Sequence, residues 1–129
     1  MKNFKILEEI SKLEFLLIKI ILPFWEKNGI DFNKGGFYEF IKNSDKGFGE
    51  IRRTRLIARQ IYSFSEGFAL GWEGPVEKII KHGLDFFIKN EMISSSGRLA
   101  KSINLKNSEV DFSYDLYDYA FFLFCLAEI

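Results

Sequence analysis

The sequence predicts an all-α chain of helical hairpins, interrupted by two short β-hairpin insertions. Apolar residues recur at helical spacing in four segments, residues 6–24, 52–66, 76–90 and 114–129. Two glycine-led, turn-rich segments, residues 31–51 and 94–110, each precede one of these helices. The order of helix, hairpin and helix thus occurs twice, at a period of about sixty residues, which is typical of stacked structural repeats.

Length and composition bound the class of protein. At 129 residues, of which 47% are hydrophobic and 17% aromatic, the chain suits one modest globular domain and is not expected to be disordered. Eighteen basic residues balance eighteen acidic ones, so no positive field would attract nucleic acid or an anionic membrane. The single cysteine, Cys125, excludes a disulfide framework within the chain and fits a cytoplasmic protein.

The first helix is predicted to be amphipathic and to pack on a partner. Its apolar stripe consists of Ile6, Ile10, Leu13, Leu17, Ile20 or Ile21, and Phe24. Lysine and glutamate interrupt the apolar run, which excludes a signal peptide, and no stretch reaches the roughly 20 apolar residues of a membrane span. Pro23 and then Asn28-Gly29 are expected to end the helix.

Residues 31–51 are predicted to form a β-hairpin or a compact loop. Gly35-Gly36 opens a strand-like run at residues 37–41, and turn residues follow at Asn43, Ser44, Asp45 and Gly47. Paired glycines can also cradle a phosphate, but no helix N-terminus follows directly. A plain tight turn is therefore the preferred interpretation.

The helix at residues 52–66 is the segment around which the chain is organised. Its core-facing side carries Ile57, Ile61, Phe64 and Phe68. Its opposite side carries Arg52, Arg55 and Arg59, and each like-charge pair costs roughly 0.2–0.5 kcal/mol on an isolated helix. An acidic group is thus expected to face them.

Two kinds of acidic group would satisfy these arginines. One is a set of protein carboxylates, for which the candidates are Asp111, Asp115 and Asp118. The other is a polar or anionic ligand held by the planar guanidinium groups. The residues alone favour the first alternative, a solvated or ion-paired face.

The second half of the chain repeats the first. Pro75 is placed to start the helix at residues 76–90, where His82 lies on the polar side and is expected to be a surface residue. Residues 36–60 align with residues 97–122, which places Ala58 opposite Ala120. The last helix stops within an apolar pattern without a capping signal, so the chain is expected to be cut short.

Several motifs, in this order and approximate spacing, resemble the N-acylglucosamine 2-epimerase family, which includes mannose isomerase-like and cellobiose 2-epimerase-like enzymes. They are Leu22-Pro-Phe-Trp25, Gly35-Gly-Phe-Tyr-Glu39, Arg52-Arg53, Ala58-Arg-Gln-Ile-Tyr62, Gly71-Trp72 and Asp115-Leu-Tyr-Asp-Tyr-Ala-Phe121. The resemblance covers nearly the whole chain. It implies an (α/α)6 barrel around a sugar pocket, of which residues 1–129 would be a single N-terminal portion, about a third of the barrel.

The resemblance also implies a chemistry and site residues. The family moves a proton at the carbon next to a sugar aldehyde or ketone, with histidines as acid and base and no cofactor. Arg59 matches the arginine of the Ala-Arg motif and is the candidate catalytic residue. Tyr117 matches the pocket tyrosine, and Arg55 and Tyr38 are further candidates for substrate contact. The catalytic histidines have no counterpart in this chain.

Three positions differ from the family pattern. Arg55 stands where a large apolar residue is usual, Ile57 where glutamine is usual, and Tyr119 where histidine is common. The differences imply either another sugar specificity or a relaxed constraint on a working site.

The sequence therefore predicts an N-acylglucosamine 2-epimerase-like or aldose–ketose isomerase-like protein that is inactive alone. The expected substrate is mannose, an N-acylhexosamine or a phosphorylated hexose, and no metal is expected. Since the apolar residues at 121–126 cannot all be buried within four helices, self-association or pairing with a C-terminal part is also expected. The alternative is a non-catalytic helical-repeat module that binds a protein partner.

Overall fold

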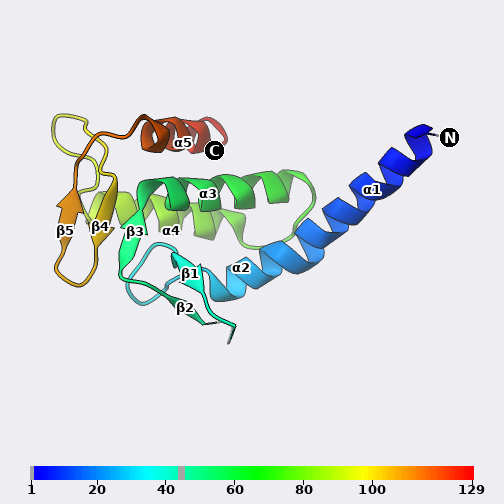
Figure 1. The fold of residues 1–129 in the computed structure, drawn as a ribbon, viewed down its shortest axis with the longest axis horizontal. Coiled ribbons are helices and arrows are strands. Elements are labelled where there is room, and N and C mark those ends of the chain that lie inside the picture. The colour runs from blue at the N-terminus through cyan, green and yellow to red at the C-terminus, as the bar shows by residue number, and fades with distance from the viewer. Residues whose placement is uncertain (1, 44–45) are drawn as a thin grey trace.

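The structure is a computed structural model that describes residues 2–43 and 46–129. It is mostly helical, with small antiparallel sheets. The helices are α1 (Lys2–Leu16), the π-helical turn η1 (Leu17–Ile21), α2 (Leu22–Asn28), α3 (Thr54–Ala69), α4 (Val76–Lys89) and α5 (Leu116–Ala127). The strands are β1 (Phe40–Ile41), β2 (Gly47–Phe48), β3 (Ile51–Arg53), β4 (Ser102–Asn104) and β5 (Glu109–Asp111). Figure 1 shows α3 lying alongside α4 and α5, with β3, β4 and β5 at one end.

The N-terminal helices form one continuous rod, so the prediction that Pro23 ends the helix is wrong. Pro23 lies at the start of α2, directly after the wider turn η1. A proline cannot donate to the preceding turn, and a π-helical turn at this point accommodates the lost bond without breaking the rod. The predicted end at Asn28-Gly29 is confirmed, since the Gly29 amide donates to the Trp25 carbonyl over 2.8 Å.

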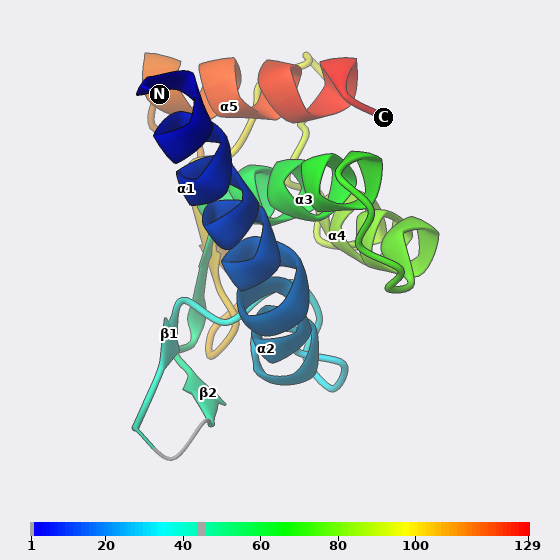
Figure 2. The same ribbon diagram turned by 90° about the vertical axis from the view of Figure 1, so that its right-hand side faces the viewer.

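The helix α1 extends away from the other helices (Figure 1), and Figure 2 shows it from a second side. Its apolar side chains are exposed, among them Ile6, Ile10 and Leu13. The predicted partner for this part of the stripe is therefore not found among the described residues, whereas Leu17, in η1, packs against the core. None of the described helices is long and apolar enough to span a membrane.

The core forms around α3, where Ile57, Ile61 and Phe64 are fully buried as predicted. Gly83 brings α4 close, because a Cβ atom at this position would lie 2.7 Å from Ile61 Cδ1. The prediction for Phe68 is wrong, since 55% of its surface is exposed. It lies in the last turn of α3, on an open groove shared with α4 and the end of the chain.

The strands form two small antiparallel sheets. Phe40 pairs with Phe48 in the predicted hairpin, whose expected turn residues Ser44 and Asp45 lie outside the described residues. The second sheet has the order β3-β4-β5, with Ile103 between Arg52 and Val110. Arg52 thus belongs to a strand, and the helix predicted from residue 52 begins at Thr54. Arg53 is extended, and the Thr54 hydroxyl donates to the Ala100 carbonyl over 2.5 Å.

The predicted repeat is confirmed. In the first half, α2 leads through the bridge between Ile30 and Phe37 into the β1–β2 hairpin and α3. In the second half, α4 leads through the bridge between Ile93 and Leu99 into the β4–β5 hairpin and α5. The repeat places α3 and α5 as equivalent helices that lie side by side.

Candidate functional site

Arg55 is held by two carboxylates at the start of α5. Its Nε donates to Asp118 Oδ1 over 2.8 Å and its Nη2 to Asp118 Oδ2 over 3.1 Å, and it also contacts Asp115. Asp118 is only 1% exposed, so its charge depends on this bidentate partner. The prediction that Asp115 and Asp118 face the arginines is thus confirmed for Arg55. Asp111 instead accepts from the Ser113 amide over 2.8 Å.

Asp115 links this ion pair to the N-terminus of α5, because it is also the N-cap residue of that helix. Its backbone is extended, and its Oδ1 caps the helix by accepting from the Tyr117 amide over 3.0 Å. That backbone hydrogen bond, together with the hydrogen bond from Arg55, lowers the pKa of Asp115. The hydrogen bond with Asp118 raises the pKa of Arg55, which therefore stays charged. The cap and the ion pair thus orient the first turn of α5, which carries Tyr117.

Tyr117 lies between two guanidinium groups. Its ring centre is 5.0 Å from Arg55 Cζ and 5.2 Å from Arg59 Cζ, and Arg59 Nη2 also donates to its hydroxyl. Arg59 Cζ lies 4.3 Å from the ring centre of Phe121 as well. Three predicted site residues, Arg55, Arg59 and Tyr117, are therefore brought together by the contact between α3 and α5.

Arg59 differs from Arg55 in having no carboxylate partner among the described residues. It is also exposed. Its remaining N–H donors are accordingly available for an oxygen of a ligand. A pocket of about 290 Å³ lined by Ala120, Phe121 and Phe124 borders this position.

Arg52 is not part of this cluster, and the prediction that it shares a polar face with Arg55 and Arg59 is wrong. It is completely buried, with Nη2 2.7 Å from Asp31 Oδ2 and Nη1 2.7 Å from the Gly49 carbonyl. The reason is that strand β3 points its side chain inward, where a carboxylate and backbone carbonyls replace water. The sequence pattern does not predict Asp31 as the partner of Arg52. The only local sign of a role for Asp31 is that it precedes the turn at residues 33–35, where its carboxylate accepts hydrogen bonds from the Asn33 and Lys34 amides.

Tyr38, the fourth predicted site residue, lies with Arg52. Its ring centre is 5.2 Å from Arg52 Cζ, and burial and the nearby Asp31 raise its pKa. Tyr38 therefore packs on a buried ion pair instead of contacting Arg59 or Tyr117. Gly35 and Gly36 both have positive φ angles, of 90° and 69°, in the tight turn that precedes it.

His82 is half-buried, which corrects its prediction as a surface residue. Its Nε2 lies 3.0 Å from the Gly36 carbonyl, and its ring packs between Phe32 and Phe37 at 5.3 and 6.0 Å. The loop before β1 folds over α4 and covers the side of the helix that carries His82. The helical pattern alone predicts that this side is polar and exposed. The described residues contain no group of three or more metal-ligating side chains.

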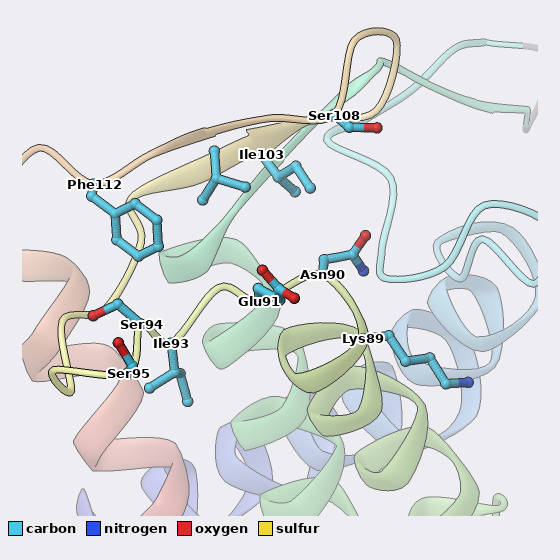
Figure 3. A pocket seen from close by; sticks show the side chains of 10 residues that line it. Lys89, Asn90, Glu91, Ile93, Ser94, Ser95, Ile103, Ser108 and Phe112 are labelled. Carbon is cyan, nitrogen blue, oxygen red and sulfur yellow. The ribbon is translucent and has the colours of Figure 1, made fainter.

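A further pocket, of about 700 Å³, lies away from these arginines. It is bounded by the end of α4, the loop that follows and the β4–β5 hairpin (Figure 3). Its lining residues are Lys89, Asn90, Glu91, Ile93, Ser94, Ser95, Ile103, Ser108, Val110 and Phe112. It shares none of them with the cluster of Arg55, Arg59, Tyr117, Asp115 and Asp118.

Comparison with known proteins shows similarity to one protein family and to a curated relative. A family model described as N-acylglucosamine 2-epimerase (GlcNAc 2-epimerase) matches residues 35–129, which include every member of the arginine and aspartate cluster. A protein of Rhizobium meliloti (strain 1021), named mannose-6-phosphate isomerase, is 33% identical over 110 residues. That match covers 84% of this chain and 28% of the relative, so the chain spans well under a third of the relative's length.

Proposed function

The chain belongs to the N-acylglucosamine 2-epimerase family of sugar epimerases and isomerases, and on this basis we propose that Arg59 and Tyr117 contact the sugar in an aldose–ketose isomerase. The observation that carries the proposal is the exposed guanidinium of Arg59, hydrogen-bonded to Tyr117 and free of any carboxylate among the described residues. The name of the relative favours mannose 6-phosphate or a similar hexose as substrate. An N-acylhexosamine is the second candidate.

The proposed chemistry is the transfer of a proton between C1 and C2 of the open-chain sugar. A base removes the C2 proton, and the electron pair forms a C1–C2 double bond while negative charge develops on the C1 oxygen. The donors of Arg59 would stabilise this oxygen, because a fixed cation in a site shielded from water acts strongly on developing charge. Transfer of the C2 hydroxyl proton to the C1 oxygen, and return of the abstracted proton to C1, then complete the ketose.

The described residues place no histidine and no carboxylate in contact with Arg59. The one histidine of the sequence, His82, is on α4 and bonds to Gly36. The proposal therefore assigns proton transfer to residues of a longer protein, and assigns binding and charge stabilisation to this chain. Within an (α/α)6 barrel, α3 and α5 would be neighbouring helices of the inner ring, which their equivalence in the repeat supports.

The test is a chimera in which residues 1–129 replace the matching part of the mannose-6-phosphate isomerase relative. We expect the chimera to convert mannose 6-phosphate to fructose 6-phosphate and, in D₂O, to exchange the C2 proton. The chain alone should show neither reaction. A chimera that melts cooperatively yet exchanges no proton would contradict the proposal and favour the non-catalytic repeat module.

A further inference from the structure

We infer that the pocket between the end of α4 and the β4–β5 hairpin is a second carbohydrate site, which takes an uncharged pyranose. The inference goes beyond the proposed reaction, because this pocket shares no residue with the cluster around Arg59 and Tyr117. Its volume of about 700 Å³ lies within the range of small-molecule sites, roughly 300–1,000 Å³.

The two sides of the pocket differ in chemistry. In Figure 3 the side chains of Ile103 and Phe112 point from the hairpin toward Asn90 and Glu91 at the end of α4. The hairpin side is thus apolar, and the helix side supplies a carboxylate and an amide. Asn90 Nδ2 is committed to the Phe86 carbonyl at 2.8 Å, which leaves its Oδ1 as an acceptor. A pyranose matches this division, since its C–H face packs on an aromatic ring while its hydroxyl groups donate to polar side chains.

Backbone strain independently marks the same pocket. Among the described residues only two other than glycine have positive φ angles, Glu91 at 52° and Ser108 at 59°, and both line it. Glu91 occupies the position after the C-cap of α4, where glycine is usual. The Glu91 and Met92 amides close the end of the helix by donating to the Ile88 and Phe87 carbonyls over 3.3 and 3.0 Å. A glutamate at this position costs conformational energy that glycine would avoid, so the pocket carries a carboxylate at a strained backbone position.

The charge of the pocket decides between classes of sugar. Glu91 has no salt-bridge partner within residues 2–43 and 46–129. Lys89 and Glu91 both line the pocket, so one charge of each sign borders it, but in Figure 3 the Lys89 side chain extends away from the hairpin. A phosphorylated or acidic sugar facing the hairpin would place its charge near the unpaired Glu91 carboxylate, whereas the hydroxyl groups of a neutral pyranose can donate to that carboxylate.

The experiment titrates the full chain, labelled at isoleucine δ1 methyl groups, with methyl α-D-mannopyranoside. This glycoside has no free anomeric carbon and cannot isomerise, so a response reports binding alone. We expect saturable shifts of the Ile103 and Ile93 methyl resonances with a Kd on the order of 1 mM. Mannose 6-phosphate should bind at least about threefold more weakly, because of its charge.

The decisive variant is Glu91→Gly. It should raise Tm, because glycine adopts the positive φ angle freely, and it should weaken binding at least about tenfold. Phe112→Leu, which keeps an apolar side chain, should weaken binding without unfolding the chain. The matched control Glu73→Gln removes an exposed carboxylate elsewhere and should leave the affinity unchanged.

Three results would overturn the inference. One is the absence of a saturable shift up to about 50 mM glycoside, far above the expected Kd. Another is wild-type affinity in Glu91→Gly. The third is loss of the Ile103 shift in Arg59→Ala or Tyr117→Phe, which would place the sugar at the proposed reaction site. The proposed function would survive that third result, so the two proposals fail separately.

Discussion

The guanidinium of Arg52 lies 2.7 Å from the carboxylate of Asp31, and both side chains are almost completely withdrawn from solvent. Arg52 also donates to the Gly49 and Ile51 carbonyls at 2.7 and 3.2 Å. This pair ties the loop after α2 to β3, directly before α3 begins. It thereby anchors the start of the helix that carries Arg55 and Arg59.

Removing one partner of this pair should destabilise the chain strongly. Asp31→Ala leaves a buried guanidinium without its carboxylate, and we expect the free energy of unfolding to fall by about 3–5 kcal/mol. Urea denaturation measures the change. The control is Glu50→Ala, whose ion pair with Lys34 is about half exposed and should contribute at most about 1 kcal/mol. Similar losses in both variants would show that the buried Asp31–Arg52 pair contributes no more stability than an exposed ion pair.

Acid should weaken the contact between α3 and α5. The Tyr117 amide and Arg55 lower the pKa of Asp115 below its ordinary value of 3.8. A carboxyl group with a depressed folded-state pKa contributes stability above its unfolded pKa and loses it as the pH falls through the folded value. Unfolding followed from pH 6 to pH 2 should therefore show a smaller loss of stability in Asp115→Asn, which keeps a capping side chain. The same pH dependence in Asp115→Asn and in the wild-type chain would contradict a stabilising role of the Asp115 carboxylate.

Substitution of Arg59 should affect the reaction far more than the fold. In the chimera, Arg59→Ala should lower kcat/KM by on the order of 100-fold, about 2.7 kcal/mol of transition-state stabilisation. Lys78→Ala, an exposed cation on α4, should change it little. Arg52 is unsuitable as the control because it is buried. Steady-state assays on mannose 6-phosphate provide the measurement. Equally small effects of both substitutions would indicate that Arg59 is a solvated surface residue without a role in the reaction.

The exposed side of α5 should cause association. Leu123, Phe124 and Leu126 are 64%, 50% and 41% exposed, which confirms that the apolar residues of this helix are not all buried. Burying one such side chain is worth roughly 1.5–3 kcal/mol. Sedimentation across a concentration series should reveal self-association that the double variant Leu123→Lys, Phe124→Lys abolishes. Leu70→Lys, an equally exposed position at the end of α3, serves as control; a monomeric wild-type chain at all concentrations would refute the prediction.

Local patterns predicted much of the fold. The core positions Ile57, Ile61 and Phe64, the helix from Val76 and the two hairpins follow from spacings of a few residues, which the sequence displays directly. The predictions for Pro23 and Arg52 were wrong for different reasons. The π-helical turn before Pro23 has no propensity signal, and the strand at Arg52 depends on pairing with β4, about fifty residues away.

By itself, the sequence determined the family and the repeat, because motif order and helical periodicity are local properties. Only the tertiary structure decided what each arginine does. Arg52 is buried because Asp31 pairs with it from the loop after α2. Arg55 is paired with carboxylates because the first turn of α5 lies against α3, and Arg59 keeps free donors because its neighbour is Tyr117. These partners are distant in sequence, and the helical pattern treats all three arginines alike.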